Sequence, residues 1–563
     1  MFEQFLADGI TFMFGNPGTS EQGFLDAVDD FAEMKYILAL QETIAVAMAD
    51  GHARVTKKPT VVQLHAGVGL GNGIGMMYQA MRGHAPLVVV AGEAGIRYDA
   101  MDAQMYADLV AMAEPVTKWA TRVVDPSSVL RVLRRAIKMA ATPPMGPVFV
   151  SLPMDILDAP NDEDVVPTSF PQTRVLPEQD LIDQAASLLI GARKPLILMG
   201  DGIAYSYAQD ELVQVAEALG AEVWGVDNSE VNMSYLHPLY RGSTGHMFGS
   251  TSHKITADAD AILIVGTYVF PEVFPALSDV WPKDARVVHI DLDAYEIAKN
   301  FPITLGLVAD PKPTLAALAR SLDAQMSARQ KDEARARIQA LGQAKEQARA
   351  AQIEKDRAVR DSVPLHASAF FEELAKHVPQ DVIIFDDALQ SSPPLTRYLP
   401  PTLPDHFFQI RGGSLGLGIP GALGIKLARP DKTVISVSGD GGSMYTIQAL
   451  WTAAHHNIGA KFIICNNQSY MLLKENILQY WRERGIEEHE FPASFNLIDP
   501  VINFSGIANA LGVEAAKVER PEEIGPAIRQ MLDHDGPFLI DLVISNEVAG
   551  SKIPAMATRA KVY

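Results

Sequence analysis

Short apolar runs rich in β-branched residues alternate with longer stretches of helical period along most of this 563-residue chain. This alternation restricts the fold more than any other feature, because neighbouring parallel strands must be joined by long crossovers, which are usually helices. We therefore predict an α/β protein of three domains, each with a central parallel sheet flanked by helices. The predicted strands fall within residues 11–14, 60–64, 87–91, 147–152, 194–200, 221–226, 261–267, 285–293, 381–387, 432–438, 461–465 and 537–545.

Changes in composition divide the chain into blocks. An acidic, proline-containing stretch without periodicity follows the first group of predicted strands, at 155–176, and is predicted to be a linker. A stretch rich in Ala, Gln, Arg, Lys and Glu follows the second group and is predicted to form a mostly solvated helix. The predicted boundaries are an N-terminal domain at 1–160, a central domain at 177–325, a charged helical linker at 326–361, a C-terminal domain at 362–548 and a tail at 549–563.

The chain is acidic, with 47 Lys and Arg against 68 Asp and Glu and a formal net charge of −21. Such a chain has no overall attraction for a phosphate backbone or an anionic membrane, so we expect no binding to nucleic acid or membrane. The one cysteine, Cys465, excludes an intrachain disulfide framework and a cysteine-based metal centre. No apolar run reaches about 18 residues and no signal-like segment opens the chain, so a cytoplasmic protein is expected.

Two polar motifs follow neighbouring apolar runs in the C-terminal block. The first run leads directly into Gly439-Asp440-Gly441-Gly442, and the second leads into Asn466-Asn467. Asp440 and Asn467 are 27 positions apart, which leaves room for one helix between two adjacent parallel strands. Both side chains are therefore predicted at the carboxyl ends of the strands, where open α/β sheets bind ligands. The glycines allow a phosphate group to approach the backbone, and the next helix offers its N-terminus to the anion.

One carboxylate and one amide oxygen are hard ligands that suit Mg²⁺, which completes its coordination with phosphate oxygens and water. The pair of motifs resembles the thiamine-diphosphate signature, in which a GDG sequence is followed by NN one strand–helix–strand unit later. The resemblance implies that Asp440, Asn467 and the main-chain carbonyl of Ser469 hold Mg²⁺, which in turn holds the diphosphate of thiamine diphosphate. The residues of this region that it assigns to cofactor binding are Gly439, Asp440, Gly441, Gly442, Ser443, Asn467 and Ser469.

A segment of the N-terminal block independently supports this resemblance. Residues 40–54, LQETIAVAMADGHAR, are similar to the family's helix that carries a glutamate and ends in a Gly-Tyr/His-Ala-Arg run. Glu42 stands at the predicted start of this helix among apolar neighbours, where its charge is disfavoured unless it is paired. The resemblance implies that Glu42 shares a proton with the aminopyrimidine ring and activates the cofactor. The N-terminal domain is then the pyrimidine-binding domain, and the C-terminal domain binds the diphosphate and Mg²⁺.

Two further stretches of the C-terminal block fit the same pattern. Residues 412–420, GGSLGLGIP, resemble the segment in which a bulky apolar side chain holds the cofactor in a bent shape. Leu415 matches that position, and Gly413 is expected to contact the cofactor beside it. The strand end at 385–392 is expected to line the diphosphate pocket through Gln390 and Ser391.

Within the family the chain is most similar to benzoylformate decarboxylase. Its segments 14–19 (FGNPGT), 37–42 (ILALQE), 64–65 (LH) and 449–454 (ALWTAA) carry this resemblance. In that enzyme a serine after the NPG turn contacts the substrate carboxylate, and Thr19 keeps a hydroxyl at this position. A catalytic histidine matches His65, which is predicted at a strand end beside a glycine-rich loop and suits proton transfer near neutral pH.

The chain departs from benzoylformate decarboxylase around the substrate. The second active-site histidine of that enzyme has no counterpart in the comparable stretch 266–273. Aromatic pocket positions are replaced by Gln409 and Asn476, which predicts a more polar pocket. The full set of expected pocket residues is Asn16, Gln409, Leu472, Leu473 and Asn476.

The resemblance implies a non-oxidative decarboxylation of a 2-oxo acid to an aldehyde, with a carboligase side activity. The alternatives are a C–C lyase or ligase of the 2-hydroxyacyl-CoA or acetolactate synthase type, and a binding protein that kept the fold without catalysis. The substrate is a small-molecule 2-oxo acid or acyl compound. Because the family's pyrimidine and diphosphate domains meet across chains, the expected active unit is at least a homodimer, usually a homotetramer.

Two segments leave open questions. Gly200-Asp201-Gly202 follows a predicted strand but lacks a GxGxxG sequence, and some relatives bind FAD or ADP in this domain. We expect a structural central domain without a nucleotide. The basic tail, 549–563, resembles the flap with which 2-hydroxyacyl-CoA lyases and oxalyl-CoA decarboxylases close over a thioester.

Overall fold

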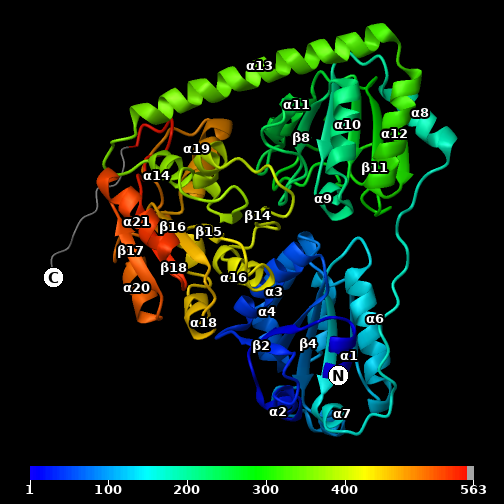
Figure 1. Ribbon diagram of the computed structural model, residues 1–563, viewed down its shortest axis with the longest axis vertical. Coiled ribbons are helices and arrows are strands. Elements are labelled where there is room, and N and C mark those ends of the chain that lie inside the picture. Colours follow the sequence, from blue (N-terminus) through cyan, green and yellow to red (C-terminus); the bar gives the residue numbers. More distant parts are fainter. Residues whose placement is uncertain (554–563) are drawn as a thin grey trace. The chain divides into compact units, whose positions relative to one another are not determined.

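Three six-stranded parallel sheets form the framework of the chain, and the predicted fold class is confirmed. The computed structural model describes residues 1–553, so the flap expected at 549–563 lies mostly outside the described residues. Every strand pairing in the described registers is parallel. Helices join the consecutive strands of the first and third sheets and lie against the sheets (Figure 1).

The first sheet has the order β2-β1-β3-β4-β6-β5. Its central strands β3 and β4 are almost entirely buried, which explains their continuous apolar runs. Its strands are β1 (Phe12–Gly15), β2 (Lys35–Leu38), β3 (Thr60–His65), β4 (Leu87–Glu93), β5 (Trp119–Arg122) and β6 (Val148–Pro153). The helices around it are α1 (Phe2–Ala7), α2 (Gln22–Val28), α3 (Glu42–Thr56), α4 (Ala66–Arg82), α5 (Leu109–Ala113), α6 (Val129–Ala141) and α7 (Met154–Leu157).

The second sheet has the order β12-β11-β10-β7-β8-β9. Its strands are β7 (Pro195–Met199), β8 (Glu222–Gly225), β9 (Tyr240–Ser243), β10 (Ala261–Val265), β11 (Arg286–Asp291) and β12 (Leu305–Val308). The helices of this part are α8 (Gln179–Leu189), α9 (Gly202–Ser206), α10 (Gln209–Leu219), α11 (Gly249–Thr256), α12 (Pro311–Gln325) and α13 (Ala328–Ala358). The segments that join β8 to β9, β10 to β11 and β11 to β12 lie within the described residues and contain no helix.

The third sheet has the order β14-β13-β15-β16-β18-β17. Its strands are β13 (Ile383–Asp387), β14 (Phe407–Gln409), β15 (Val434–Gly439), β16 (Lys461–Asn466), β17 (Glu514–Val518) and β18 (Phe538–Val543). The helices of this part are α14 (Ala367–Leu374), α15 (Ser392–Tyr398), α16 (Gly418–Ala428), α17 (Asp440–Ser443), α18 (Ala449–His455), α19 (Met471–Arg484), α20 (Phe504–Ala510) and α21 (Pro521–Asp533).

The chain forms two compact units. The first contains residues 1–171, 360–394 and 410–563, and the second contains residues 172–359 and 395–409. Within the first unit, α3 packs against α16 (Figure 1). Glycines permit this contact, because a Cβ on Gly51 would overlap the carbonyl O of Gly421 and one on Gly424 would overlap the carbonyl O of Met48. The helix that begins at Glu42 is thereby held against the C-terminal part of its own chain.

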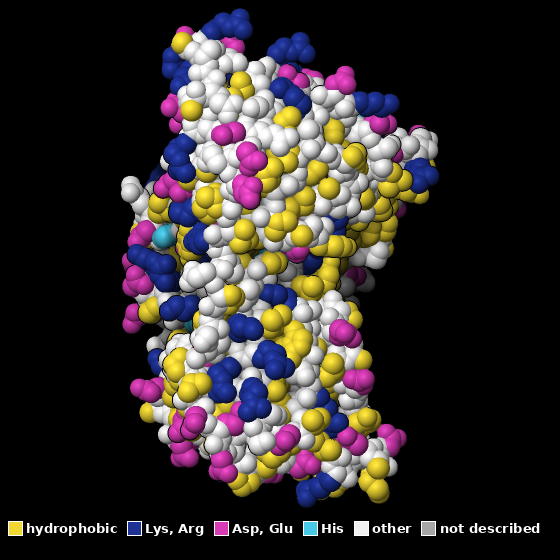
Figure 2. Space-filling model, turned by 90° about the vertical axis from the view of Figure 1, so that its right-hand side faces the viewer, with side chains coloured by type: hydrophobic (Ala, Val, Ile, Leu, Met, Phe, Trp, Pro, Cys, Tyr) yellow, Lys and Arg dark blue, Asp and Glu magenta, His cyan; other side chains and the backbone are white. Residues whose placement is uncertain are grey.

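The helix α6 shows how the sequence pattern produces the packing. Leu130, Leu133 and Ile137 recur at helical spacing and are buried under the first sheet. The opposite face carries Arg131 and Arg135, which are exposed. Figure 2 shows a group of Lys and Arg side chains over the lower part of one face, where α6 lies. An acidic chain thus carries a local basic surface on this helix.

The charged stretch after the second sheet is helical, as predicted. The helix α13 begins at a capping box of Ser327 and Gln330, and only Ala334 and Asp356 are buried along its 31 residues. Among residues 1–553, no helix is both long and apolar enough to cross a membrane.

Candidate active site

The carboxyl ends of β13, β15 and β16 meet at one edge of the third sheet. The registers pair Asp387 with Ser438, and Gly439 with Cys465, so the residues that follow these strands lie side by side. One main-chain group joins the two polar motifs: the amide of Ser469 donates to Asp440 Oδ2 (3.3 Å) and to Asn467 Oδ1 (3.0 Å). The two motifs that the sequence placed one strand–helix–strand unit apart are therefore in contact.

Asp440 is a buried carboxylate, and the charge of the buried Lys474 acts on it without forming an ion pair. Asp440 is 3% exposed, and none of the ion pairs found among residues 1–553 involves it. Burial raises the pKa of Asp440 to about 7, although main-chain hydrogen bonds from Gly441, Gln468 and Ser469 act in the opposite direction. A divalent cation would balance this charge, and the hard oxygens of Asp440 and Asn467 suit Mg²⁺. No group of three or more His, Cys, Asp or Glu that could hold a metal is present among the described residues, so phosphate and water would supply the other ligands.

The loop after β15 is shaped for close backbone approach. A Cβ on Gly441 would overlap the ring of Tyr470, whereas Gly439 has open space where its Cβ would be. Ser443 Oγ donates to the carbonyl of Gly439 at 2.7 Å and closes the single turn of α17. This turn presents main-chain N–H groups at the sheet edge, which suits a diphosphate.

Glu42 is the first residue of α3 and is 7% exposed. Gln41 caps the helix, since its side-chain Oε1 accepts a hydrogen bond from the amide N–H of Thr43 at 2.6 Å. Asn72 on α4 donates to Glu42 Oε2 at 2.9 Å, and Thr43 Oγ1 donates to the carbonyl of Asn72 at 2.6 Å. A Cβ on Gly69 would lie 2.9 Å from Glu42 Oε1. The carboxylate is thus buried and held on one oxygen by Asn72, a contact that the sequence pattern did not reveal.

His65 ends β3, as predicted, but the glycine-rich run after it lies within α4 and is not a loop. The loop prediction was wrong because residues 66–82 bury one helical face in spite of their glycines. His65 Nδ1 lies 3.0 Å from Glu21 Oε2 and 3.2 Å from Ser20 Oγ. Glu21 is 2% exposed, so His65 is paired with a buried carboxylate that sequence reasoning missed.

The turn before η1 (Thr19–Glu21) packs on His65. A Cβ on Gly18 would overlap the His65 ring. Thr19 is exposed and Asn16 is half-buried, both on the chain that leaves β1. The structure therefore brings the predicted residues Asn16 and Thr19 to the same strand edge as His65.

Leu415 is half-buried in the loop before α16, and Gly413 is exposed two residues earlier. The 3₁₀ helix η5 (Leu389–Ser391) follows β13 and carries both predicted pocket residues. Gln390 hydrogen-bonds to Glu475 of α19, and burial raises the pKa of Glu475. The side chain of Ser391 hydrogen-bonds to Cys465, whose pKa burial raises to about 12, so this thiol is unreactive.

The other residues that the sequence predicted for the pocket are described unit by unit. Leu472, Leu473 and Asn476 occupy the first turns of α19, and Leu473 is 42% exposed. Gln409 ends β14, and its amide donates to the carbonyl of Ser229 at 2.8 Å within the second unit.

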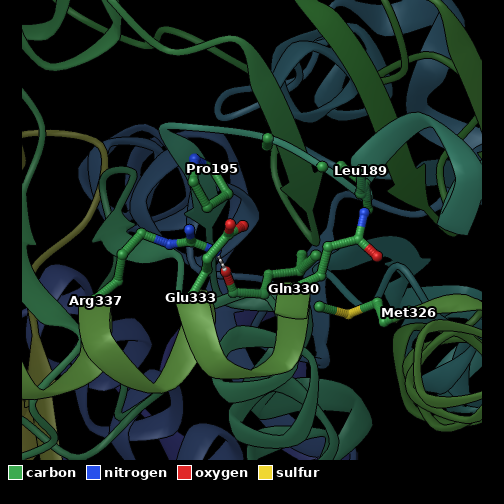
Figure 3. A pocket seen from close by; sticks show the side chains of 9 residues that line it. Leu189, Pro195, Met326, Gln330, Glu333 and Arg337 are labelled. Atoms are coloured by element: carbon green, nitrogen blue, oxygen red, sulfur yellow. Dashed lines mark hydrogen bonds between the residues drawn. The ribbon is translucent and has the colours of Figure 1, made fainter. Parts of the chain in front are cut away.

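In the second unit, Gly202 and Gly266 follow the neighbouring strands β7 and β10. The strand order reverses between β7 and β10, where such sheets bind nucleotides. Here the backbones of Gly202 and Gly266 touch, since a Cβ on Gly266 would lie 2.8 Å from the Cα of Gly202. A small pocket lies elsewhere in this unit, between α13 and the start of β7 (Figure 3). None of its lining residues, which include Gln330, Glu333 and Arg337, was predicted as a site residue.

The fold and the site together define a class: an α/β enzyme framework with an acidic, glycine-lined edge for a diphosphate and a buried glutamate on a separate helix. Family models of thiamine pyrophosphate enzymes match the chain in three segments. They are the N-terminal TPP binding domain at residues 1–112, the central domain at 182–318 and the C-terminal TPP binding domain at 390–542.

Individual relatives agree with these models. Benzoylformate decarboxylase of Pseudomonas aeruginosa is 32% identical over 95% of this chain and 96% of its own. Sulfoacetaldehyde acetyltransferase of Castellaniella defragrans is 30% identical over 94% and 89%. The structure of a thiamine diphosphate-dependent 4-hydroxybenzoylformate decarboxylase from Rhodococcus jostii has a TM-score of 0.83 at 27% identity, covering 97% of this chain and 98% of that one. The chain belongs to the thiamine pyrophosphate enzyme family.

Proposed function

We propose that this protein is a thiamine-diphosphate- and Mg²⁺-dependent decarboxylase of a 2-oxo acid that releases an aldehyde and has a carboligase side activity. The observation that carries the proposal is the amide of Ser469, which binds both Asp440 and Asn467 and so makes one site from two strand ends. The similarity to benzoylformate decarboxylase supports the reaction class. The domain boundaries predicted from the sequence are part of the proposal.

The diphosphate end of the site is assigned to the third sheet. Asp440 and Asn467 would ligate Mg²⁺ together with the carbonyl of Ser469, and the turn at 439–443 would receive the diphosphate. Gln390 and Ser391 stand at the next strand end and would line the same pocket. Leu415 is assigned to the support of the cofactor between its two rings.

Thiamine diphosphate, when bound, would supply a nucleophilic carbon for the 2-oxo group and a cationic ring that takes up the electron pair left when CO₂ departs. Glu42 exchanges a proton between its carboxylate and the aminopyrimidine ring. The hydrogen bond from Asn72 holds one oxygen of Glu42, so that the other remains available for this proton. Burial of Glu42 keeps water from competing for the proton.

His65 is assigned to proton transfer at the carbon that receives a proton before the aldehyde leaves. Because Glu21 accepts at Nδ1, the neutral ring carries its proton there and leaves Nε2 as the free base. Thr19 offers a hydroxyl to the substrate carboxylate from the same strand edge. Asn16, Leu472, Leu473, Asn476 and Gln409 are assigned to the substrate pocket, whose polar members favour a substrate with a polar side group.

The active unit is proposed to be a homodimer or a homotetramer in which Glu42 of one chain serves the diphosphate site of its partner. Apolar side chains beside both halves of the site are exposed in the single chain: Leu40 is 46% exposed and Tyr445 is 58% exposed. Such apolar groups next to polar site residues mark an interaction surface. Replacing Tyr445 by Glu is expected to shift the protein to monomers without activity.

The test is an assay of CO₂ release from a panel of 2-oxo acids, with thiamine diphosphate and Mg²⁺ present. Aldehyde release from 2-hydroxyacyl-CoA esters and 2-hydroxy ketone formation from pyruvate are measured in parallel. We expect CO₂ and aldehyde from at least one 2-oxo acid, and almost none from the Glu42→Gln variant, which should still fold. Turnover of the CoA esters or formation of acetolactate without aldehyde would replace the proposal with the lyase or synthase alternative.

A further inference from the structure

Asp387 is a buried carboxyl group that neither the sequence pattern nor the proposed function uses. It ends β13 and is 2% exposed. Its Oδ2 accepts the amides of Gly416 at 3.2 Å and Gly418 at 3.1 Å. Its Oδ1 is buried and has no hydrogen-bond partner among residues 1–553. Two donors converge on one oxygen: Gly416 lies in the loop that carries Leu415, and Gly418 is the first residue of α16, directly after that loop.

The loop is held at further points around Leu415. Thr446 Oγ1 donates to the carbonyl of Gly416 at 2.6 Å, and Ser414 Oγ donates to the carbonyl of Gly75 at 3.0 Å. Gly416 has φ +88°, and a Cβ there would lie 2.7 Å from Cβ of Tyr445. The residue after Leu415 is therefore fixed at its N–H by Asp387, at its carbonyl by Thr446 and by a backbone conformation that only glycine adopts readily.

The surroundings of Asp387 favour its neutral form. None of the ion pairs described for residues 1–553 includes it. Burial raises the pKa of Asp387 to about 7, and the charge of Asp386 adds to this effect. A neutral carboxyl group keeps the carbonyl oxygen that the two amides need, and it adds no negative charge beside a diphosphate.

We propose that Asp387 is a positioning residue for Leu415, because its carboxyl oxygen fixes the two amides that follow Leu415 and so fixes the direction of that side chain. The inference rests on the proposed function, in which Leu415 supports thiamine diphosphate. A role limited to capping α16 would affect the stability of the helix without changing how Leu415 meets the cofactor.

The test compares Asp387→Ala, which removes the acceptor, with Asp387→Asn, whose amide matches a neutral carboxyl group in shape and keeps a carbonyl. The first readout is hydrogen exchange of the peptide covering 412–418 in the cofactor-free protein. Asp387→Ala should exchange at least about tenfold faster there, while Asp387→Asn should match the wild type; one exposed amide in a loosened loop already gives such a change. Unchanged exchange in Asp387→Ala would overturn the proposal.

The second readout is the turnover number, kcat, measured with the cofactor present. With thiamine diphosphate and Mg²⁺, Asp387→Ala should lower kcat by about 100-fold, the cost of a displacement of about 1 Å in a reacting group. Leu415→Ala should lower kcat similarly, and the double variant should be no worse than Leu415→Ala alone. Effects that multiply in the double variant would show that Asp387 does not act through Leu415.

Two controls separate the possible failures. If Asp387→Ala does not fold, Asp387→Leu removes the same acceptor while filling the buried space and should raise exchange at 412–418 in the same way; unchanged exchange in that variant would then overturn the proposal. If Leu415→Ala binds and turns over like the wild type, the assigned role of Leu415 fails and the positioning proposal fails with it. Whether the wild type binds thiamine diphosphate with Mg²⁺ would then still test the proposed function independently.

Discussion

Replacement of Glu21 by Gln tests how His65 is held. Glu21 Oε2 lies 3.0 Å from His65 Nδ1, and Ser20 Oγ donates to Glu21 Oε1 at 3.0 Å. A carboxylate can only accept, so the His65 proton is held on Nδ1 and Nε2 is free to take a proton. The amide of Gln can instead turn its NH₂ group toward Nδ1, which moves the ring proton to Nε2 and removes the base.

The size of the effect follows from the contact that is lost. Glu21 is 2% exposed, so water does not compensate for a missing acceptor. A hydrogen bond to a charged group contributes about 1.5–3 kcal/mol. At about 1.36 kcal/mol per tenfold change, Glu21→Gln should lower kcat/KM by about 10- to 150-fold. Ser20→Ala removes the hydroxyl that contacts His65 Nδ1 at 3.2 Å and Glu21 Oε1 at 3.0 Å, but it keeps the carboxylate on Nδ1, so it should stay within about threefold of the wild type.

The assay is steady-state CO₂ release from whichever 2-oxo acid is turned over fastest, for the single variants and for His65→Ala with and without Glu21→Gln. Because Glu21 acts through His65, adding Glu21→Gln to His65→Ala should change kcat/KM little. The reasoning is refuted if Glu21→Gln stays near wild-type activity while His65→Ala is inactive. It is also refuted if Glu21→Gln costs the same factor in both backgrounds.

Two further predictions concern stability. Burial lowers the pKa of His289 to about 4, and its ring is used on both nitrogens, by the carbonyl of Thr267 and the amide of Ala298. As the pH falls, the unfolded chain therefore binds a proton on His289 before the folded chain does. The wild type should lose about 3 kcal/mol of stability as the pH falls from about 6.5 to about 4. Chemical denaturation at several pH values should show a smaller loss in His289→Gln, and an equal dependence of stability on pH in both proteins would contradict the prediction. In the first unit, Gly424→Ala places a Cβ on the Met48 carbonyl and should lower the free energy of unfolding by about 3 kcal/mol. The matched control Gly75→Ala has open space within α4 and should stabilise by about 0.5–1 kcal/mol, so equal effects of the two changes would disprove the close α3–α16 contact.

The strand–helix alternation was enough to predict the fold class, because buried parallel strands are continuous apolar runs. The predicted strand at 60–64 appears as β3 and that at 432–438 overlaps β15, which begins two residues later and ends one residue later. The short edge strands β2, β5, β9, β12, β14 and β17 were not predicted as such. Edge strands are partly exposed, as in β5, where no residue is fully buried, so they lack the apolar run that marks a central strand.

The sequence likewise predicted some residues of the candidate site and missed others. Asp440 and Asn467 directly follow buried strands, and sequence order alone places such residues at one sheet edge. Glu21, Asn72 and Asp387 contribute through contacts with residues 29 to 44 positions away, as in the pair of Glu21 with His65 and that of Asp387 with Gly416. These contacts depend on how loops and helices pack over the sheet. A lone acid in a turn gives no signal of its partner before the fold is known.

The central claim is that the third sheet binds thiamine diphosphate through a metal held by Asp440 and Asn467. Calorimetric titration of the cofactor into metal-free protein, with and without Mg²⁺, tests this claim most directly. The account predicts binding by the wild type only when Mg²⁺ is present, and a loss of affinity of at least about 100-fold in Asp440→Ala, since the metal loses its one protein carboxylate. Binding of equal strength without divalent metal, or by Asp440→Ala, would contradict it.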